Sequence, residues 1–328
     1  MEESSLSLQD LENAAEDTQP VHTTPPKPNP ARPAAAKPAA SPKPNPAPPK
    51  KIPLKRRKRR GCTGGGAILL AALIGFVLYL LFPTRTNVLV FGIDSRPEEG
   101  NAARADTIML ASVVPLTPDV NLLSIPRDLW VTMPDGSENR INAAHVFAEL
   151  NETGSGPAAM EATVRDNFGV QVDYFVRLRF EGVTDVVDTL GGVTVTLPRA
   201  MSGYEAGSVT LDGTAALAFV RDRTGSDDFF RMERGQIFLR GLMRTLLEPS
   251  SWGRLPALVP VVVQLVETDI PVWAWPRLGL AVLRAGPNGI VSKSITREMV
   301  NPFTTGAGAQ VLAPNWDIIR PELDGFVR

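Results

Sequence analysis

The sequence predicts an α/β domain with a central mixed β-sheet covered by helices on both faces, preceded by a disordered tail and one transmembrane helix. Three observations support this prediction. Residues 20–53 are rich in proline, alanine and lysine, residues 64–82 are uncharged and mostly apolar, and the remainder alternates between strand-like and helix-like segments. The 328 residues therefore divide into a tail at 1–60, a membrane helix at 61–83 and a folded domain at 84–328.

The tail is expected to lack a packed core. Residues 20–53 hold too few large apolar side chains to bury, and their prolines favour an extended polyproline II conformation. At ~3.1 Å per residue this segment can reach up to roughly 100 Å. A solvated spacer and a docking segment for a cytoplasmic partner are both open interpretations.

A basic cluster at residues 50–60 directly precedes the apolar run. The 19 residues from Gly64 to Phe82 would span roughly 28 Å as a helix, about the thickness of one hydrocarbon core. Since positive charge stays on the cytoplasmic side, we expect a single-pass protein of the cell membrane with a cytoplasmic N-terminus and an extracytoplasmic C-terminal domain. A cleaved signal peptide fits less well, because 60 residues precede this segment and no Ala-x-Ala site ends it.

The folded domain contains seven segments with the composition of β-strands and six with helical periodicity. The expected strands are 87–93, 107–114, 120–126, 129–134, 173–180, 193–198 and 291–296. The expected helices are 141–151, 157–168, 180–191, 211–223, 228–247 and 272–285. Residues 255–266 fit a helix or a strand equally well, because Pro260 lies in a run of β-branched residues. Helices that separate strands favour a sheet covered on both faces.

Charge is distributed unevenly along the chain, although the formal net charge is only −1. Residues 1–60 hold 12 basic and 6 acidic side chains, whereas residues 61–328 hold 22 and 29. An acidic body argues against a general nucleic-acid binder. Beyond residue 60, Lys293 is the only lysine and every other basic residue is arginine. This preference reflects either compositional bias or planar, bidentate recognition of phosphate or carboxylate.

The sequence lacks the residues of several common sites. Cys62 is the only cysteine, so an internal disulfide and a CxxC site are excluded. His22 and His145 are too few for a histidine-based metal centre. No HExxH or GxSxG motif occurs, and the glycine run before the apolar segment lacks the Lys-Ser/Thr of a phosphate-binding loop.

Four short stretches place charged side chains at the ends of apolar elements: GIDSR with RADT, SIPRD, AFVRDR and DDFFRMERGQ. Their charged residues include Asp94, Arg96, Arg104, Asp106, Arg127, Asp128, Arg221, Arg223, Asp227, Asp228, Arg231 and Arg234. Taken singly, each stretch is more simply a local ion pair. Taken together, the arginines suit an anion with many oxygen atoms, of which a pyrophosphate is the simplest. Two aspartates at neighbouring strand ends suit Mg²⁺ or Mn²⁺ bound together with phosphate oxygens.

The order of these motifs resembles the LytR–CpsA–Psr family of bacterial cell-wall enzymes. The motifs are GIDSR, RADTIML, SIPRDLWV, RINAAHVFAE, YFVRLRFEGVTDVVDTLGGVTV, LDGTAALAFVRDR and DDFFRMER, placed after an N-terminal anchor. The resemblance is strong over residues 87–236 and weak over the C-terminal third, apart from VLAPNWDIIRPEL. It implies a phosphotransferase that moves a glycopolymer from an undecaprenyl-pyrophosphate carrier to a muramic acid hydroxyl of peptidoglycan, outside the membrane.

The resemblance also implies roles for single residues. Asp94 and Asp106 would hold Mg²⁺ or Mn²⁺. The pyrophosphate-binding arginines would be Arg104, Arg127, Arg221, Arg223 and Arg231, of which the first four, with Asp106, would be catalytic. The family pattern continues as R-x-x-R-Q, but here Gly235 stands where that glutamine is expected. Gln236 lies about 100° further around a helix and cannot simply replace it.

The sequence leaves the general base and the reaction open. Asp106, Asp94 or His145 could accept the proton of an attacking hydroxyl, although a histidine beside Ala144 and Phe147 is more often a packing residue. With water as acceptor, the same site would hydrolyse polyprenyl pyrophosphates. A non-catalytic, membrane-tethered protein that binds wall polymer or regulates is a third interpretation. A lipid carrier would also need an apolar slot, which the Leu- and Val-rich helices could line.

Overall fold

The computed structural model describes residues 63–94, 100–115, 117, 119–222, 228–286 and 288–327. The chain divides into two units at residues 1–60 and 61–328, and the first lies outside the described residues. The predictions for the tail are therefore untested. Four residues singled out above also lie outside this part of the chain: Cys62, Arg96, Arg223 and Asp227.

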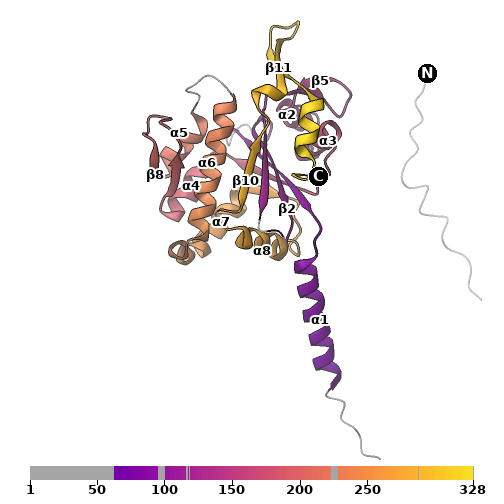
Figure 1. The fold of residues 1–328 in the computed structure, drawn as a ribbon, viewed down its shortest axis with the longest axis vertical. Coiled ribbons are helices and arrows are strands. Elements are labelled where there is room, and N and C mark those ends of the chain that lie inside the picture. The colour runs from indigo at the N-terminus through magenta and orange to yellow at the C-terminus, as the bar shows by residue number, and fades with distance from the viewer. Residues whose placement is uncertain are drawn as a thin grey trace, which may run out of the picture. The chain divides into compact units, whose positions relative to one another are not determined.

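A six-stranded mixed sheet forms the centre of the domain (Figure 1). Its order is β10-β3-β2-β1-β6-β9. The strands are β1 (Thr86–Ile93), β2 (Ala105–Val113), β3 (Val120–Ile125), β6 (Tyr174–Arg179), β9 (Val266–Thr268) and β10 (Ile290–Ser294). β1 runs antiparallel to β2 and parallel to β6, while β3 runs antiparallel to β2 and parallel to β10. The prediction of a mixed central sheet is confirmed.

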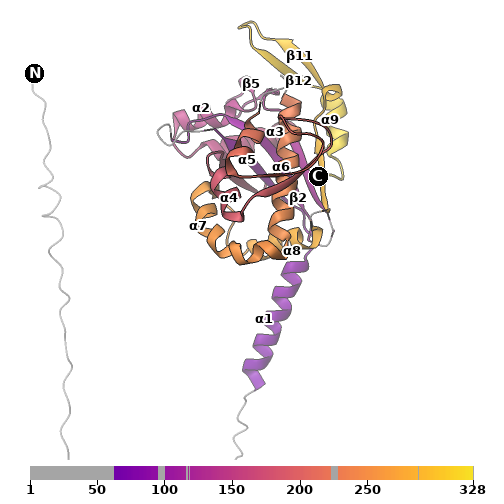
Figure 2. The same cartoon turned by 90° about the vertical axis from the view of Figure 1, so that its left-hand side faces the viewer.

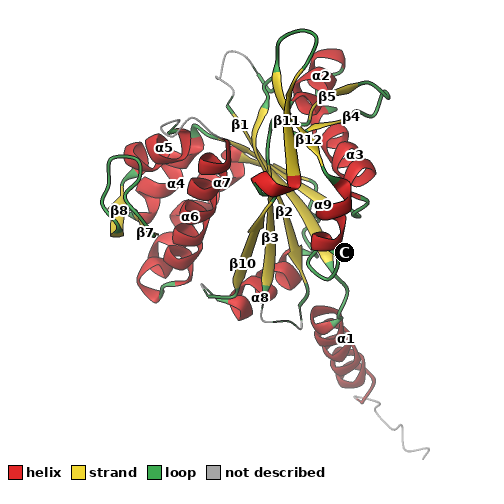
Figure 3. Ribbon diagram, turned by 45° about the horizontal axis from the view of Figure 1, so that its top comes forward, coloured by secondary structure: helices red, strands yellow, loops and turns green. Residues whose placement is uncertain are grey.

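The two faces of the sheet have separate helical covers, as Figure 3 shows. Successive side chains of a strand point to opposite faces. Leu89, Phe91 and Ile93 of β1 belong to the core on one face, and Val90 and Gly92 line a cavity on the other. The first face is covered by α2 (Ala143–Asn151), α3 (Gly156–Phe168) and α9 (Trp316–Leu323). The second group of helices is α4 (Gly182–Leu190), α5 (Gly213–Arg221), α6 (Asp228–Leu247) and α7 (Leu255–Leu265). The expected cover on both faces is confirmed.

Two segments expected as strands form ribbons outside the central sheet. They are β4 (Trp130–Thr132), which pairs with β5 (Glu138–Arg140), and β7 (Val193–Leu197), which pairs with β8 (Gly207–Leu211). A further ribbon among the described residues pairs β11 (Val300–Thr304) with β12 (Gln310–Pro314). β7 buries every second residue in a core shared with α6. Its alternating pattern therefore needs cover on only one face of the ribbon. Gly241 permits this packing, because a Cβ there would lie 2.7 Å from the carbonyl oxygen of Thr194. The part of the chain that the structure describes also contains short 3₁₀ helices at Pro249–Arg254 and Arg297–Met299.

The segment that the sequence left open contains both a helix and a strand. α7 runs to Leu265 with Pro260 inside it, and β9 begins at the next residue, Val266. β9 pairs antiparallel with β6, with Val266 opposite Leu178. The chain therefore passes directly from a helix that covers the sheet to a strand at its edge.

α1 (Thr63–Leu81) coincides with the apolar run, and its C-terminal end contacts the segment leading into α8 (Trp275–Ala285). The Tyr79 hydroxyl donates to the carbonyl oxygen of Trp273 at 3.0 Å. Arg277 donates to the carbonyl oxygen of Phe82 at 3.1 Å. Within the described residues, no helix has both the length and the apolarity to cross a membrane.

Glu161 on α3 gives the domain a pH-dependent stability. Burial, with a smaller contribution from Asp269, raises the pKa of Glu161 from 4.5 to about 7. Such a carboxyl contributes stability that is full below pH 4.5 and is lost as the pH rises through 7. We expect Glu161→Gln to raise Tm over the parent protein at pH 8 and to change it little at pH 5. Thermal unfolding by circular dichroism measures this. Exposed Glu152→Gln is the control, and an equal gain at both pH values would contradict the assignment.

Candidate active site

The charged stretches converge at one end of the sheet, where β1 and β3 end and β2 begins. The antiparallel pairing of β2 with both neighbours brings these three strand ends together. Asp94 directly follows β1, Asp106 is the second residue of β2, and Arg127 lies two residues beyond β3. Asp228 opens α6 and Arg221 closes α5. Residues up to 134 positions apart in the sequence therefore lie at the same end of the sheet.

A β-bulge gives Asp106 its position. Gly92 of β1 pairs with Thr107 and Ile93 pairs with Ala105, so Asp106 is an extra residue with no partner on β1. Bulges of this kind redirect side chains and are frequent beside active sites. The Asp106 carboxylate accepts a hydrogen bond from Nη1 of Arg127 at 2.5 Å.

Arg127 links three carboxylates. Besides Asp106, its Nε lies 3.3 Å from Oδ1 of Asp228 and 3.7 Å from Oδ2 of Asp128. Its backbone N–H also donates to Oδ2 of Asp228 at 3.0 Å. Burial opposes the charge of the guanidinium, but the three carboxylates together raise the pKa of Arg127 above its ordinary value. The side chain nevertheless keeps 23% of its surface exposed, so an anion can reach it.

Asp228 joins Arg127 to Arg231. Its side chain is only 8% exposed, and Oδ1 accepts from Nη1 of Arg231 at 3.0 Å. Burial raises the pKa of Asp228 although both arginines act to lower it. The local pair between Asp228 and Arg231, one helical turn apart, is therefore part of a larger network. The spacing within α6 indicated the pair, whereas the link to Arg127 spans 101 residues.

Arg221 pairs with Asp94, which precedes it by 127 residues. The sequence offered no acidic partner on the same helix, and the structure supplies one from the sheet. Both side chains are about two-fifths exposed, at 39% and 40%. Arg104, directly before β2, is exposed and forms no ion pair with a described residue. Arg223 is outside the described residues.

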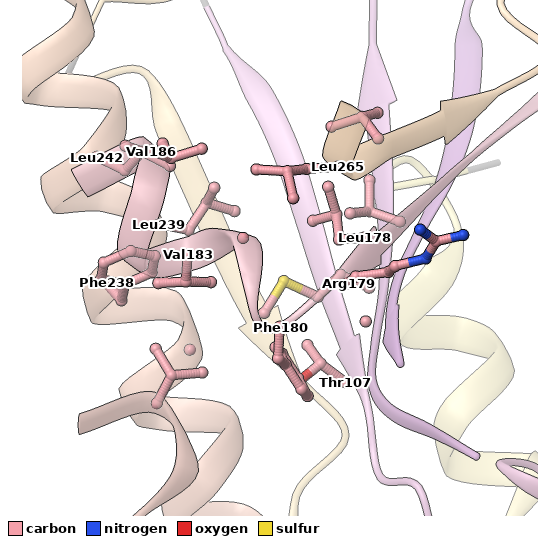
Figure 4. Close-up of a pocket in the computed structure, with 17 residues that line it drawn as sticks. Thr107, Leu178, Arg179, Phe180, Val183, Val186, Phe238, Leu239, Leu242 and Leu265 are labelled. Atoms are coloured by element: carbon pink, nitrogen blue, oxygen red, sulfur yellow. The ribbon is translucent and has the colours of Figure 1, made fainter. Parts of the chain in front are cut away.

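An apolar cavity lies beside this charged cluster, between the sheet and the helices of the second face (Figure 4). Its empty space, including its open mouth, is about 830 Å³. Val183, Val186, Leu239 and Leu242 face Leu178 and Leu265 across it. Thr107 and Met109 line both this cavity and the small cleft that contains Asp106, Asp228 and Arg231. The charged cluster and the apolar cavity are therefore contiguous.

The model of the LytR_cpsA_psr family matches residues 83–315 of this chain. The chain belongs to the LytR–CpsA–Psr family. The resemblance seen in the motifs is thereby confirmed.

Named members of the LytR–CpsA–Psr family are similar to this chain over different lengths. The polyisoprenyl-teichoic acid–peptidoglycan teichoic acid transferase TagU of Bacillus subtilis is 35% identical over 191 residues, which cover 56% of this chain and 60% of TagU. The chain thus spans about three-fifths of that relative. The probable cell wall biosynthesis protein LcpB of Corynebacterium glutamicum is 28% identical over 306 residues, covering 78% of this chain and 71% of LcpB. The crystal structure of B. subtilis TagU aligns with a TM-score of 0.55 at 26% identity, over 74% of this chain and 97% of that one.

The departure from the LytR–CpsA–Psr pattern at Gly235 has a visible structural setting. Gly235 lines the apolar cavity, where a Cβ would lie 3.2 Å from Cε of Met109. Gln236 does not take the missing role, because its amide donates to the hydroxyls of Ser124 (2.8 Å) and Ser294 (2.9 Å). Gln236 thus fastens α6 to β3 and β10. Arg234 is buried against Asp222 and is likewise engaged elsewhere.

His145 is a structural residue and is not placed to act as a general base. Its side chain is fully buried, and Nδ1 bonds to the carbonyl oxygen of Ala103 at 2.8 Å. Nε2 lies 3.0 Å from Nη1 of Arg177, so it is the acceptor nitrogen of a neutral ring. Burial lowers the pKa of His145. The candidate base suggested by the sequence therefore has no access to substrate, and the packing interpretation holds.

The fold presents few donors around the predicted metal ligands Asp94 and Asp106. Among the described residues, no group of three or more His, Cys, Asp or Glu side chains is arranged around a common metal position. Asp94 and Asp106 supply two carboxylates at neighbouring strand ends, and each is paired with an arginine. Such a donor set fits Mg²⁺ that shares its coordination with phosphate oxygens and water, and does not fit an all-protein metal cage.

Proposed function

We propose that this protein is a membrane-anchored phosphotransferase that moves a glycopolymer from an undecaprenyl-pyrophosphate carrier to a peptidoglycan hydroxyl. The observation that carries the proposal is the contiguity of an arginine-rich cluster and an apolar cavity. A polyprenyl pyrophosphate has the same division, with an anionic head and an apolar tail. Family membership and the name of TagU support the same class of reaction.

The arginines would recognise the pyrophosphate by exchange of partners. Arg127 and Arg221 are held by Asp106 and Asp94 in the free protein, which fixes the guanidinium groups at the strand ends. Both retain exposed surface, so phosphate oxygens can engage them bidentately. Arg104 is exposed two residues before Asp106 and would add a further positive charge. Charge on the transferred phosphoryl group would therefore meet preorganised donors.

The proposed step is a displacement at phosphorus. The acceptor hydroxyl oxygen forms a bond to the phosphorus that carries the glycopolymer, and the bond from that phosphorus to the bridging oxygen breaks. Undecaprenyl phosphate leaves with the electron pair of that bond. The hydroxyl proton would pass to Asp94 or Asp106, whose side chains keep 40% and 20% of their surface exposed, whereas that of Asp228 keeps only 8%.

We further propose that Asp94 and Asp106 hold Mg²⁺ when the pyrophosphate is bound. The ion would neutralise negative charge on the phosphates. We expect Asp106→Asn to weaken Mg²⁺ binding in the presence of undecaprenyl pyrophosphate, because it removes a carboxylate charge. Isothermal titration of Mg²⁺ into the complex measures this, with exposed Asp166→Asn as the control. Full transfer activity in excess chelator, with Mg²⁺ affinity unchanged in Asp106→Asn, would exclude the role.

The anchor and the localisation belong to the same proposal. α1 contains no charged residue, and its large apolar side chains are exposed over most of its length. The basic cluster at residues 50–60 precedes it in the sequence. These features support insertion of α1 in the cell membrane, with the N-terminus in the cytoplasm and the folded domain outside.

Arg221→Lys tests the proposed function against a matched control. Lysine keeps the charge but loses the planar fork, so each lost charge-assisted contact should cost about 1.5–3 kcal/mol. We expect transfer of a labelled glycopolymer from undecaprenyl pyrophosphate to peptidoglycan to fall roughly 10- to 100-fold. Arg165→Lys, in an exposed pair with Asp166, should leave the rate unchanged. Equal rates for both variants would return Arg221 to a structural role, and phosphate release without an acceptor would indicate a hydrolase.

A further inference from the structure

Large apolar side chains are exposed along one stretch of the chain, residues 252–283. They occur in and around α7, α8 and the 3₁₀ helix before α7. We call this set the apolar surface: Trp252, Val259, Val263, Val272, Trp273, Trp275 and Leu283. Val272 is 82% exposed and Trp273 is 70% exposed, although both are followed by the buried Ala274. Three of the five tryptophans of the chain lie here. Exposed large apolar side chains in such number are typical of an interaction site.

The two helices present uncharged stripes to solvent. α7 contains no charged residue, and its exposed Pro256, Val259 and Val263 recur at the spacing of one helical face. α8 repeats the pattern with exposed Pro276, Gly279 and Leu283. The stripes are therefore not the polar outer faces expected of helices that pack on a sheet and meet water.

The apolar surface is continuous with the end of α1. Trp273 accepts the hydrogen bond from Tyr79, and the Arg277 guanidinium lies 6.0 Å from the Tyr79 ring. Arg277 also donates to the carbonyl oxygen of Thr84 at 2.5 Å. Figures 1 and 2 both show α7 and α8 at the same end of the domain. The chain enters the domain at this end, between α1 and β1.

We propose that the apolar surface docks into the interfacial layer of the phospholipid bilayer that holds α1. The inference rests on the proposed insertion of α1, because that insertion places Tyr79 and Trp273 at membrane depth. Tryptophans are favoured at this level, where the ring is apolar and the indole N–H remains hydrated. Arg277 is suited to the headgroup layer, since a long basic side chain can extend to the polar region.

Docking would also connect the membrane with the apolar cavity. α7 exposes Val259 and Val263 on the proposed membrane side, while Leu265 at its end lines the cavity. A polyprenyl tail could then pass from the bilayer along α7 without crossing water. The surface thus deepens the proposed function by assigning the route through which the carrier is received.

Depth-dependent quenching tests the docking. The full chain with Cys62→Ser receives one cysteine at Val272, Leu73 or Leu150, labelled with a fluorophore. Each protein is inserted in phosphatidylethanolamine–phosphatidylglycerol vesicles containing lipids with nitroxide headgroups or nitroxide acyl chains. Leu150 is the matched control, since it is 69% exposed on α2. All three positions are exposed, so the substitutions should not disturb folding.

We expect headgroup nitroxides to quench the Val272 label. We also expect insertion in the vesicles to shift the emission of this label to the blue, while the Leu150 label changes in neither property. The Leu73 label should be quenched by acyl-chain nitroxides. Quenching of Leu73 with no difference between Val272 and Leu150 would overturn docking but keep the anchor. Quenching at Val272 that disappears on dilution of protein in lipid would assign the surface to a second copy of the chain. None of these readouts requires transfer, so loss of activity alone bears only on the proposed function.

Discussion

Arg127→Ala is expected to lower glycopolymer transfer by about 10²–10³-fold, the usual cost of removing one preorganised donor from a site of developing negative charge. Arg127 contacts Asp106, Asp128 and Asp228 and keeps an exposed surface for substrate. In the proposed function its loss removes a donor to the phosphate, and it also leaves Asp106 without the guanidinium that holds it. The measurement is the initial rate of transfer to peptidoglycan, with circular dichroism as the check on folding.

Arg140→Ala is the control for Arg127→Ala. Arg140 also pairs with Asp128, at 3.3 Å, and its Nη2 donates to the carbonyl oxygen of Gln310 in β12. It therefore shares a carboxylate with Arg127 but belongs to the β4–β5 ribbon. We expect its transfer rate to match that of the parent protein. Arg127→Lys should recover part of the lost activity, and equal losses in the Arg127 and Arg140 variants would mean that the network only supports the fold.

Arg177→Met is expected to destabilise the folded domain by about 3–5 kcal/mol, because it leaves the buried Glu149 carboxylate without its charged partner. Arg177 of β6 is 2% exposed and donates to Glu149 at 2.6 Å, to Glu267 and to the ring of His145. Glu149 is also 2% exposed, so water cannot replace the lost guanidinium. Urea unfolding of the full chain in detergent, followed by near-ultraviolet circular dichroism, gives the change in free energy.

The double variant Arg177→Met with Glu149→Gln separates charge from packing. It removes the stranded carboxylate as well, so part of the lost stability should return. Lys293→Met breaks the exposed pair with Glu322 and should cost about 0–1 kcal/mol. Should Arg177→Met unfold at the same urea concentration as the Lys293 variant, the buried network would not be what holds α2 against β6.

The elements that the sequence predicted well are those with long, regular patterns. β1, β2, β3, β6 and the helices α2 to α6 follow the expected segments within a few residues, since each buries a continuous apolar stripe or run. The short strands β5 and β8, the β11–β12 hairpin and α9 were missed. The hairpin contains Pro302 and Pro314, and the helix contains Pro321. Proline is unfavourable in both kinds of element, and tertiary packing overrides that preference here.

The sequence indicated the residue types of the candidate site and not their connections. The order of the motifs named Asp94, Asp106, Arg127, Arg221 and Arg231, and the fold brings them to one end of the sheet. The partner of each arginine depends on the register of distant strands, including a one-residue bulge, which a single sequence does not encode locally. The buried network around Arg177 was missed for the same reason, because its acids come from α2 and β9.

The same dependence on distant segments extends to both edges of the sheet. β3 is completed by β10 and β6 by β9, so the outer strands are made last along the chain. At about 5–20 residues per second, a growing polypeptide would leave the β3 edge unpaired for on the order of ten seconds. Open strand edges are templates for aggregation. Completion of the central sheet therefore coincides with protection of its edges, and a nascent chain halted before residue 290 carries an unprotected β3 edge.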